Sequence, residues 1–185
     1  MSTTEQHILR KDIEASFAAS LEQRVARSSG IQLHQVIPNH WFSAAGSECV
    51  SMYVGGYFYG CISIAQAYVE ALSKYLIEHH KLKNSKDVCI KWQRLLDGNY
   101  VTKEAHAAAM EIFGDRNDYH HLNKNISQEY QQLEKRAKQC IEKLYAIDSS
   151  IFAHTFDAGK IVPANPDYWP CDEDNKAPVF LRQRW

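Results

Sequence analysis

Residues 127–147 read SQEYQQLEKRAKQCIEKLYAI, and this stretch decides what kind of fold the chain adopts. Apolar side chains recur through it, and just before it, at intervals of three and four residues. The members of this stripe are Ile126, Tyr130, Leu133, Ala137, Cys140, Ile141, Leu144 and Ile147. Such spacing is typical of the core-facing side of a helix in a bundle. The sequence therefore predicts a long helix over residues 127–147, packed against other helices.

Another amphipathic helix is predicted near the N-terminus, from Thr4 to Arg27. Its apolar residues recur every four positions, with charged residues between them. They are Ile13, Phe17, Leu21 and Val25. Gly30 follows and favours a helix end. The next segment, Ile31–Ala45, is predicted to be a connector.

The longest helix is predicted from Glu48 to His79 or His80. Its first part, Cys49–Val69, holds no charged residue and is long enough to span a bilayer. Glycines, polar side chains and tyrosines lower its hydropathy, however, and no cluster of Lys or Arg flanks it. A buried helix in the middle of the protein is therefore predicted, and no membrane span.

Two glycines of this helix, Gly56 and Gly60, lie four residues apart and so on one face. Glycine costs helix stability, but it lets another backbone approach closely. Two interpretations are open at this point. The glycines can serve tight packing within the molecule, or a helix crossing between two copies of the chain.

Shorter helices are predicted between the long ones. One covers about Asp87–Leu96, and residues 97–99 form a turn after it. Thr102 is a suitable N-cap for the next helix, which ends before Gly114. Asp115 can cap a new helical start directly after that glycine, which predicts a kink or a restart there.

The composition of the chain changes after Asp148. Residues 157–185 contain four of the five prolines, and two pieces, 160–162 and 179–181, look extended. We therefore expect an all-α fold, with an antiparallel bundle of four to five helices over residues 1–150. A short Pro-rich C-terminal tail, residues 151–185, is expected to be irregular or β-containing and to pack on the bundle or on a partner chain.

Charge and cysteine usage argue against several classes of protein. The 21 Lys and Arg residues balance 22 Asp and Glu, whereas a general nucleic-acid coat protein is normally strongly basic. The five cysteines are scattered and form no CxxC pair, which argues against a disulfide framework and favours reduced thiols in a cytoplasmic protein. No signal peptide is recognisable. The histidines form no HExxH or HxxxH motif, so neither a metal nor another cofactor is expected.

Residues 116–121, RNDYHH, carry the candidate chemistry. Arginine is a permanent cation that braces a phosphate with a fixed fork of donors, and histidine exchanges protons near neutral pH. Together they suffice for metal-free cleavage of a phosphodiester. On an ideal helix Arg116 and His120 lie about 40° apart, whereas Arg116 and His121 lie about 140° apart. The second pair converges only if the helix is kinked or if a second copy completes the site.

This pattern resembles the HEPN family (higher eukaryotes and prokaryotes nucleotide-binding domains), helical bundles whose signature is Rx4-6H near the start of a late helix. Arg116, the polar Asn117 directly after it, and His121 match that form. A long helix with an interior acid, Glu70, precedes the motif, and the amphipathic helix described first follows it. The resemblance covers about residues 45–147.

The resemblance implies a homodimer whose motif helices face each other across a cleft. Many members are metal-independent endoribonucleases of defence or toxin–antitoxin systems, so RNA is the implied substrate and an antitoxin or defence-system protein the implied partner. His121, or its neighbour His120, would move protons at the ribose 2′-OH or the leaving 5′-oxygen. Arg116 would neutralise the phosphorane, and Asn117 would position the phosphate or orient the histidine.

Other readings of the same residues are open. The chain could be a non-catalytic HEPN-like dimerising module that binds a nucleotide or a defence-system partner, or a helical structural protein whose motif is a solvated face. Glu70 is a plausible ion-pair partner for Arg116, in a structural or an orienting role. Basic residues between Lys81 and Lys103 can form an ordinary solvated face or a surface along which RNA approaches. Where some family toxins carry a tyrosine that is modified with AMP, this chain has Asn123.

Overall fold

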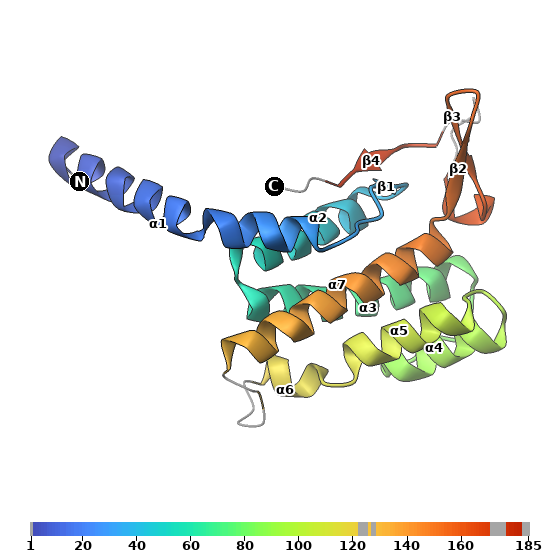
Figure 1. The fold of residues 1–185 in the computed structure, drawn as a ribbon. Coiled ribbons are helices and arrows are strands. Elements are labelled where there is room, and N and C mark those ends of the chain that lie inside the picture. Colours follow the sequence, from blue (N-terminus) through green and yellow to red (C-terminus); the bar gives the residue numbers. More distant parts are fainter. Residues whose placement is uncertain (1, 122–125, 127–128, 171–176, 183–185) are drawn as a thin grey trace.

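A computed structural model describes residues 2–121, 126, 129–170 and 177–182 (Figure 1). This part of the chain is mostly helical with a few short strands, as the sequence predicted. The helices are α1 (Thr3–Ser29), α2 (His40–Gly55), α3 (Phe58–His79), α4 (Val88–Asp97), α5 (Lys103–Phe113), α6 (Arg116–His120) and α7 (Tyr130–Ile151). The strands are β1 (Val36–Ile37), β2 (His154–Asp157), β3 (Lys160–Pro163) and β4 (Phe180–Leu181), and a 3-10 turn, η1, covers Pro166–Tyr168.

The helix predicted over residues 127–147 is present as α7, although residues 127 and 128 lie outside the described part of the chain. The predicted core-facing stripe is buried over most of its length, at Ala137, Cys140, Ile141, Leu144 and Ile147. The stripe packs against α3 and α5, which contribute buried apolar side chains of their own. This set of three helices forms the centre of the core.

The prediction of a single long helix from residues 48 to 80 is wrong, because one helix ends at Gly55 and the next begins at Phe58. Gly56 has φ +85°, in the left-handed region that glycine adopts without strain, and it ends α2 with N–H bonds to the carbonyls of Met52 and Tyr53. A Cβ built on Gly56 would lie 2.5 Å from the Tyr130 hydroxyl, and one on Gly60 would lie 2.6 Å from the sulfur of Met52. The close approach at both glycines is therefore made within the molecule. No helix in the described part of the chain is long and apolar enough to cross a membrane.

The connector predicted over residues 31–45 is also shorter than expected. Asn39 accepts hydrogen bonds from the N–H groups of Trp41 and Phe42, at 2.9 and 3.5 Å, and so caps α2 from His40 onward. The helix therefore starts eight residues earlier than the predicted Glu48. The short strand β1 precedes it.

Helix α1 matches the predicted N-terminal helix, but its apolar stripe does not face the core. Ile13, Phe17 and Val25 are 60%, 53% and 55% exposed. Within α1, Arg27 is the buried residue. Its guanidinium pairs with Glu134 of α7 at 2.8 Å and so attaches the C-terminal end of α1 to the rest of the protein. The N-terminal half projects away from the other helices (Figure 1).

The described part of the tail contacts the rest of its chain through β4 and through Tyr168, whose hydroxyl donates to the carbonyl of Tyr100 at 3.0 Å. The extended pieces predicted at residues 160–162 and 179–181 are confirmed as β3 and β4. β2 and β3 form an antiparallel hairpin, while β4 pairs antiparallel with β1, joining the tail to the segment before α2. Trp169 is 1% exposed, and the side chain of Arg182 passes into the core next to β4.

Candidate active site at the short helix α6

The candidate residues lie on a five-residue helix, α6, that restarts directly after α5. Gly114 closes α5 by donating its N–H to the carbonyl of Met110, and α6 begins two residues later, so the predicted restart is confirmed. The prediction that the Asp115 side chain caps the restart is wrong. Its carboxylate makes no cap hydrogen bond and is used elsewhere. Tyr119 is 8% exposed and packs on the ring of Tyr59 in α3, which seats α6 against that helix.

Asp115 instead anchors the start of α6 to α7 and α3. Its carboxylate accepts two hydrogen bonds from Arg136 of α7, each 2.8 Å long, and one of 2.9 Å from the amide of Gln66 in α3. Arg136 also donates to the carbonyl of Glu111, at 2.8 Å. A bidentate Arg–carboxylate pair fixes orientation as well as distance. The position of α6 is therefore set from two sides by polar contacts.

Arg116 is the first residue of α6, and its side chain is partly buried. Its Nη2 lies 3.2 Å from Oε2 of Glu70, so the expected pairing is confirmed, although Glu70 is 41% exposed and not buried as predicted. The guanidinium carbon lies 5.5 Å from the centre of the Phe113 ring, a cation–π contact. The Nε atom is buried and has no hydrogen-bond partner in the described part of the protein. The Arg116 side chain as a whole remains 31% exposed.

The two histidines end the helix. His120 is the last residue of α6 and is exposed, but the slight burial of its ring lowers its pKa from the ordinary value of 6.5. The positive charge of Arg116 also lowers the pKa of His120, while the carboxylate of Glu70 raises it. The charges of both Arg116 and Glu70 thus act on His120. His121 follows as the C-cap residue, exposed at the surface.

A cavity of about 510 Å³ opens beside Arg116. It lies between α6, the α3 residue Glu70 and the start of α4. The residues lining it are Glu70, Lys86, Asp87, Val88, Cys89, Phe113, Gly114, Arg116 and Asn117. Two cations and two carboxylates are among them, and Asp87 is occupied in capping α4. Asn117 lies exposed at the edge of this cavity, whereas His120 and His121 do not line it.

Sequence reasoning missed the residues that hold α6 in place. Gln66 gave a usable signal, since an amide within an otherwise apolar buried helix needs a hydrogen-bond partner. Arg136 gives a weaker signal of a buried polar contact, because it lies directly before the buried Ala137 on α7. Their shared partner, Asp115, is 21 residues from Arg136 and 49 from Gln66, which no local pattern reveals. Asn123 lies outside the described residues, and so does Lys124, the next Lys or Arg after Arg116 in the sequence.

Within the described residues, no three His, Cys, Asp or Glu side chains gather in a way that could hold a metal ion. The described cysteines are all free thiols. In comparisons with protein-family models, with curated proteins and with solved structures, none matches this chain.

Proposed function

We propose that this protein is a metal-independent endoribonuclease of a defence or toxin–antitoxin type, with a HEPN-like antiparallel bundle and α6 as its catalytic element. The observation that carries the proposal is the cluster on α6. Arg116 is fixed by Glu70, keeps one buried donor unpaired, and lies near enough to His120 to lower its pKa. The adjoining cavity of about 510 Å³ is within the usual size range of small-molecule sites, about 300–1,000 Å³.

The chemistry follows from these side chains. The lowered pKa of His120 keeps its imidazole neutral near pH 7, so it can take the proton from a ribose 2′-OH. The 2′-oxygen then attacks the phosphorus, and the bond from phosphorus to the 5′-oxygen breaks. His121, as an imidazolium, protonates that 5′-oxygen. The products are a 2′,3′-cyclic phosphate and a 5′-hydroxyl.

Arg116 and Asn117 act on the phosphate in this scheme. Negative charge grows on the non-bridging oxygens as the phosphorane forms, and the Arg116 side chain, which is 31% exposed and lines the cavity, offers its positive charge to them. The Asn117 amide, exposed at the cavity edge, positions the same phosphate. Because the cavity reaches Arg116 and Asn117 but neither histidine, the proposal requires a second copy whose histidines complete the site.

The proposal is tested by RNA cleavage with purified protein in EDTA, comparing wild type with Arg116→Ala, His120→Ala and His121→Ala. We expect cleavage products with 2′,3′-cyclic phosphate ends, and loss of cleavage by about 100-fold or more without Arg116 or a proton-transferring histidine. His7→Ala, on the exposed surface of α1, is the control and should cleave like wild type. Absence of cleavage by the wild type across varied RNAs rejects the nuclease.

A second function, a non-catalytic module that binds a nucleotide, is favoured by one observation. The ion pair between Arg116 and Glu70 leaves part of the guanidinium already neutralised. A partly neutralised arginine can still bind a nucleotide phosphate, which is what a binding module requires. If the module is right, Glu70→Gln should tighten binding of AMP or ATP in titration calorimetry, while neither wild type nor variant cleaves RNA.

A further inference from the structure

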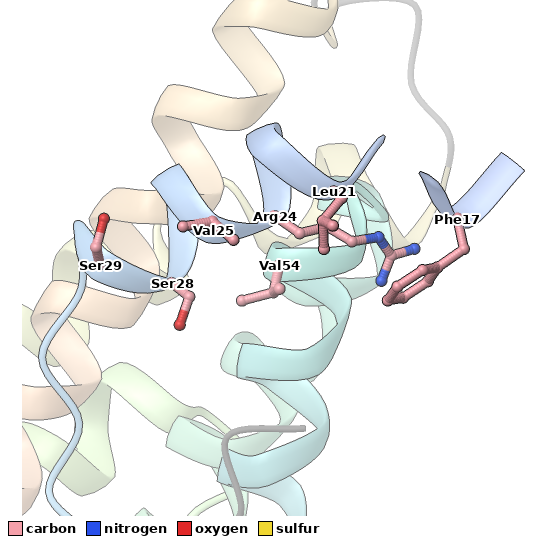
Figure 2. Close-up of a pocket in the computed structure, with 7 residues that line it drawn as sticks. All are labelled: Phe17, Leu21, Arg24, Val25, Ser28, Ser29 and Val54. Atoms are coloured by element: carbon pink, nitrogen blue, oxygen red, sulfur yellow. The ribbon is translucent and has the colours of Figure 1, made fainter. Parts of the chain in front are cut away.

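Two features of the molecule have no part in the proposed nuclease. One is a mostly apolar cavity of about 450 Å³ beside α1, lined among others by Leu21 and Val25 of α1 and Val54 of α2 (Figure 2). None of the described residues fills it. The other is the junction between the tail and the helices, where four of the nine histidines gather. Their contacts show how the tail is held.

The hairpin unit, residues 153–169, is fixed at both of its ends. It comprises β2, β3 and η1, and the hairpin stands beyond the end of α7 (Figure 1). Phe152, the residue before the unit, is 0% exposed, and the last two residues, Tyr168 and Trp169, are 5% and 1% exposed. Residues 155–160 between them are all exposed. The contacts that hold the unit therefore lie near its two ends.

His34, in the segment before β1, holds the first end. Its Nε2 lies 3.1 Å from the carbonyl oxygen of Phe152, and Nδ1 of His154 lies 3.2 Å from the same oxygen. The two imidazole rings meet edge-on, with 5.2 Å between their centres. His154 also lies edge-on against Trp169, at 5.5 Å, while Tyr145 of α7 lies 6.5 Å from His34 on another side. One imidazole of the body and one of the unit thus share a single acceptor.

His80, the residue after α3, holds the second end. Its Nε2 lies 2.8 Å from the hydroxyl of Tyr168, and that hydroxyl donates to the carbonyl of Tyr100 at 3.0 Å. Because the hydroxyl has one proton to give, it accepts from His80. The His80 ring is stacked on the Tyr100 ring at 3.8 Å, and His79 lies edge-on to His80 at 4.9 Å. His79 also lies 5.6 Å from the ring of Tyr168.

The surroundings of His34 favour its neutral form. Burial is the largest influence and lowers the pKa of His34 from the ordinary value of 6.5. The carboxylate of Asp148 and the hydrogen bond to Phe152 raise this pKa, while His154 and Arg182 lower it. A proton on His34 would therefore place a half-buried cation beside the guanidinium of Arg182 and the second imidazole.

The surroundings of His80 act in the same direction. Burial lowers the pKa of His80 from 6.5, the neighbouring His79 lowers it as well, and Asp167 of η1 opposes both. The two tyrosines that enclose the ring, Tyr100 and Tyr168, are neutral phenols near pH 7. Asp167 is therefore the one group of the hairpin unit at this end that favours a protonated His80.

Loss of the contacts would return both imidazoles to water and to their ordinary pKa. Between pH 6.5 and the lower pKa of the docked state, a chain with the unit detached binds more protons than a chain with the unit docked. Acid therefore shifts the equilibrium towards detachment. His34 and His80 lie at opposite ends of the unit, so their protonation loosens both attachments together.

We propose that the hairpin unit is a pH-sensitive flap, docked on the helices at neutral pH and released in mild acid when His34 and His80 take up protons. The helical core and the pairing of β4 with β1 stay intact during release. No residue of α6 takes part, so the flap does not depend on the proposed nuclease activity.

The test is fluorine NMR of the full chain labelled with 5-fluorotryptophan, recorded from pH 7.5 to 5.5. Trp169 reports on the flap, and Trp169→Phe assigns its resonance. Trp92 of α4 is 0% exposed and donates to the carbonyl of Val69 in α3, at 3.3 Å, so it reports on the core. As the pH falls, the Trp169 resonance should acquire the H2O/D2O isotope shift of an exposed indole, while the Trp92 resonance stays that of a buried one.

Substitutions of the two histidines identify the groups that titrate. Glutamine keeps a donor for Phe152 or Tyr168 but takes up no proton, so His34→Gln and His80→Gln should each weaken the response and the double variant should abolish it. His7→Gln, on the exposed surface of α1, is the control and should respond like wild type. The Trp92 resonance at pH 7.5 checks that every variant is folded.

Three results overturn the proposal, and the first two need the wild type alone. Trp169 may stay buried down to pH 5.5, which means that the unit is not released. Trp169 and Trp92 may become exposed together, which means that acid unfolds the whole protein. A response that persists unchanged in the double variant assigns the titration to groups other than these two histidines.

Discussion

Arg182 and Asp148 form an ion pair inside the protein, with Nη1 and Oδ2 2.5 Å apart and with side chains that are 1% and 0% exposed. Tyr68 joins them: its hydroxyl donates to Asp148 and accepts from Arg182, both at 2.7 Å. Arg182 donates further to the carbonyls of His34 and Phe42, each at 3.2 Å. Through this network β4 is tied to α7, α3 and the segment around α2.

Replacing Arg182 with Met should destabilise the protein strongly. The substitution leaves the carboxylate of Asp148 buried without its counter-charge, and breaking a buried pair in this way costs about 3–5 kcal/mol. The free energy of unfolding in urea measures the loss. Arg10→Met is the control, because Arg10 and its partner Glu14 are 78% and 61% exposed. A loss for Arg182→Met no larger than that of the control would contradict the role assigned to the pair.

Stability should decrease as the pH falls below 6.5. Burial lowers the pKa of both His34 and His80 from that ordinary value. Between 6.5 and the lower pKa of the folded state, the unfolded chain binds more protons than the folded one, so protonation favours unfolding. Urea midpoints at pH 7.5, 6.5 and 5.5 follow the effect. His34→Gln should flatten this dependence, whereas His7→Gln, on the exposed surface of α1, should leave its slope unchanged.

The protonation of His120 should respond in opposite directions to its two charged neighbours. Arg116→Gln removes a positive charge that lowers the pKa of His120, so this pKa should rise. Glu70→Gln removes a carboxylate that raises the pKa, so it should fall. NMR titration of the imidazole resonances resolves both shifts. The pKa of His34, lowered chiefly by its own burial, serves as the internal reference and should not move.

Two glycines with positive φ should differ in their tolerance of alanine. Gly56 and Gly159 have φ values of +85° and +79°, and alanine at either position carries a backbone cost of about 1–2 kcal/mol. A methyl group on Gly56 would also press against the hydroxyl of Tyr130, whereas nothing lies within 4 Å of one on Gly159. Thermal unfolding should therefore show the larger loss for Gly56→Ala. Equal losses would mean that Tyr130 moves aside freely.

The sequence predicted the elements that depend on local pattern. The stripe of α7 lies where its spacing placed it, and Thr102 caps α5 through a hydrogen bond of 3.1 Å to the N–H of Ala105. The break at Gly56 was missed because a glycine pair is compatible with two outcomes, a tight helix crossing or a helix end. In the structure, Gly56 also accepts a hydrogen bond from the hydroxyl of Tyr130, 74 residues later, a contact that no local pattern reveals.

The sequence singles out the candidate residues of α6, but it does not reveal the side chains that hold this helix in place. The spacing of Arg116 and His120 predicts a shared face, and the structure gives both side chains a common electrostatic environment. The contacts that hold the site, from Asp115 to Arg136 and Gln66, connect segments far apart in sequence. The burial of Arg182 was equally hidden from the sequence. Arginine is rarely buried, and no neighbouring residue in the sequence indicates that Asp148 is its partner.

The ion pair between Asp148 and Arg182 also sets an order of events during synthesis. Asp148 belongs to α7, yet its counter-charge is added 34 residues later. At translation rates of about 5–20 residues per second, Arg182 is therefore added about 2–7 s after Asp148. A nascent chain can form its helices in that interval, but the close-packed interior must await Arg182. Chaperones that bind incompletely packed chains have this interval in which to act.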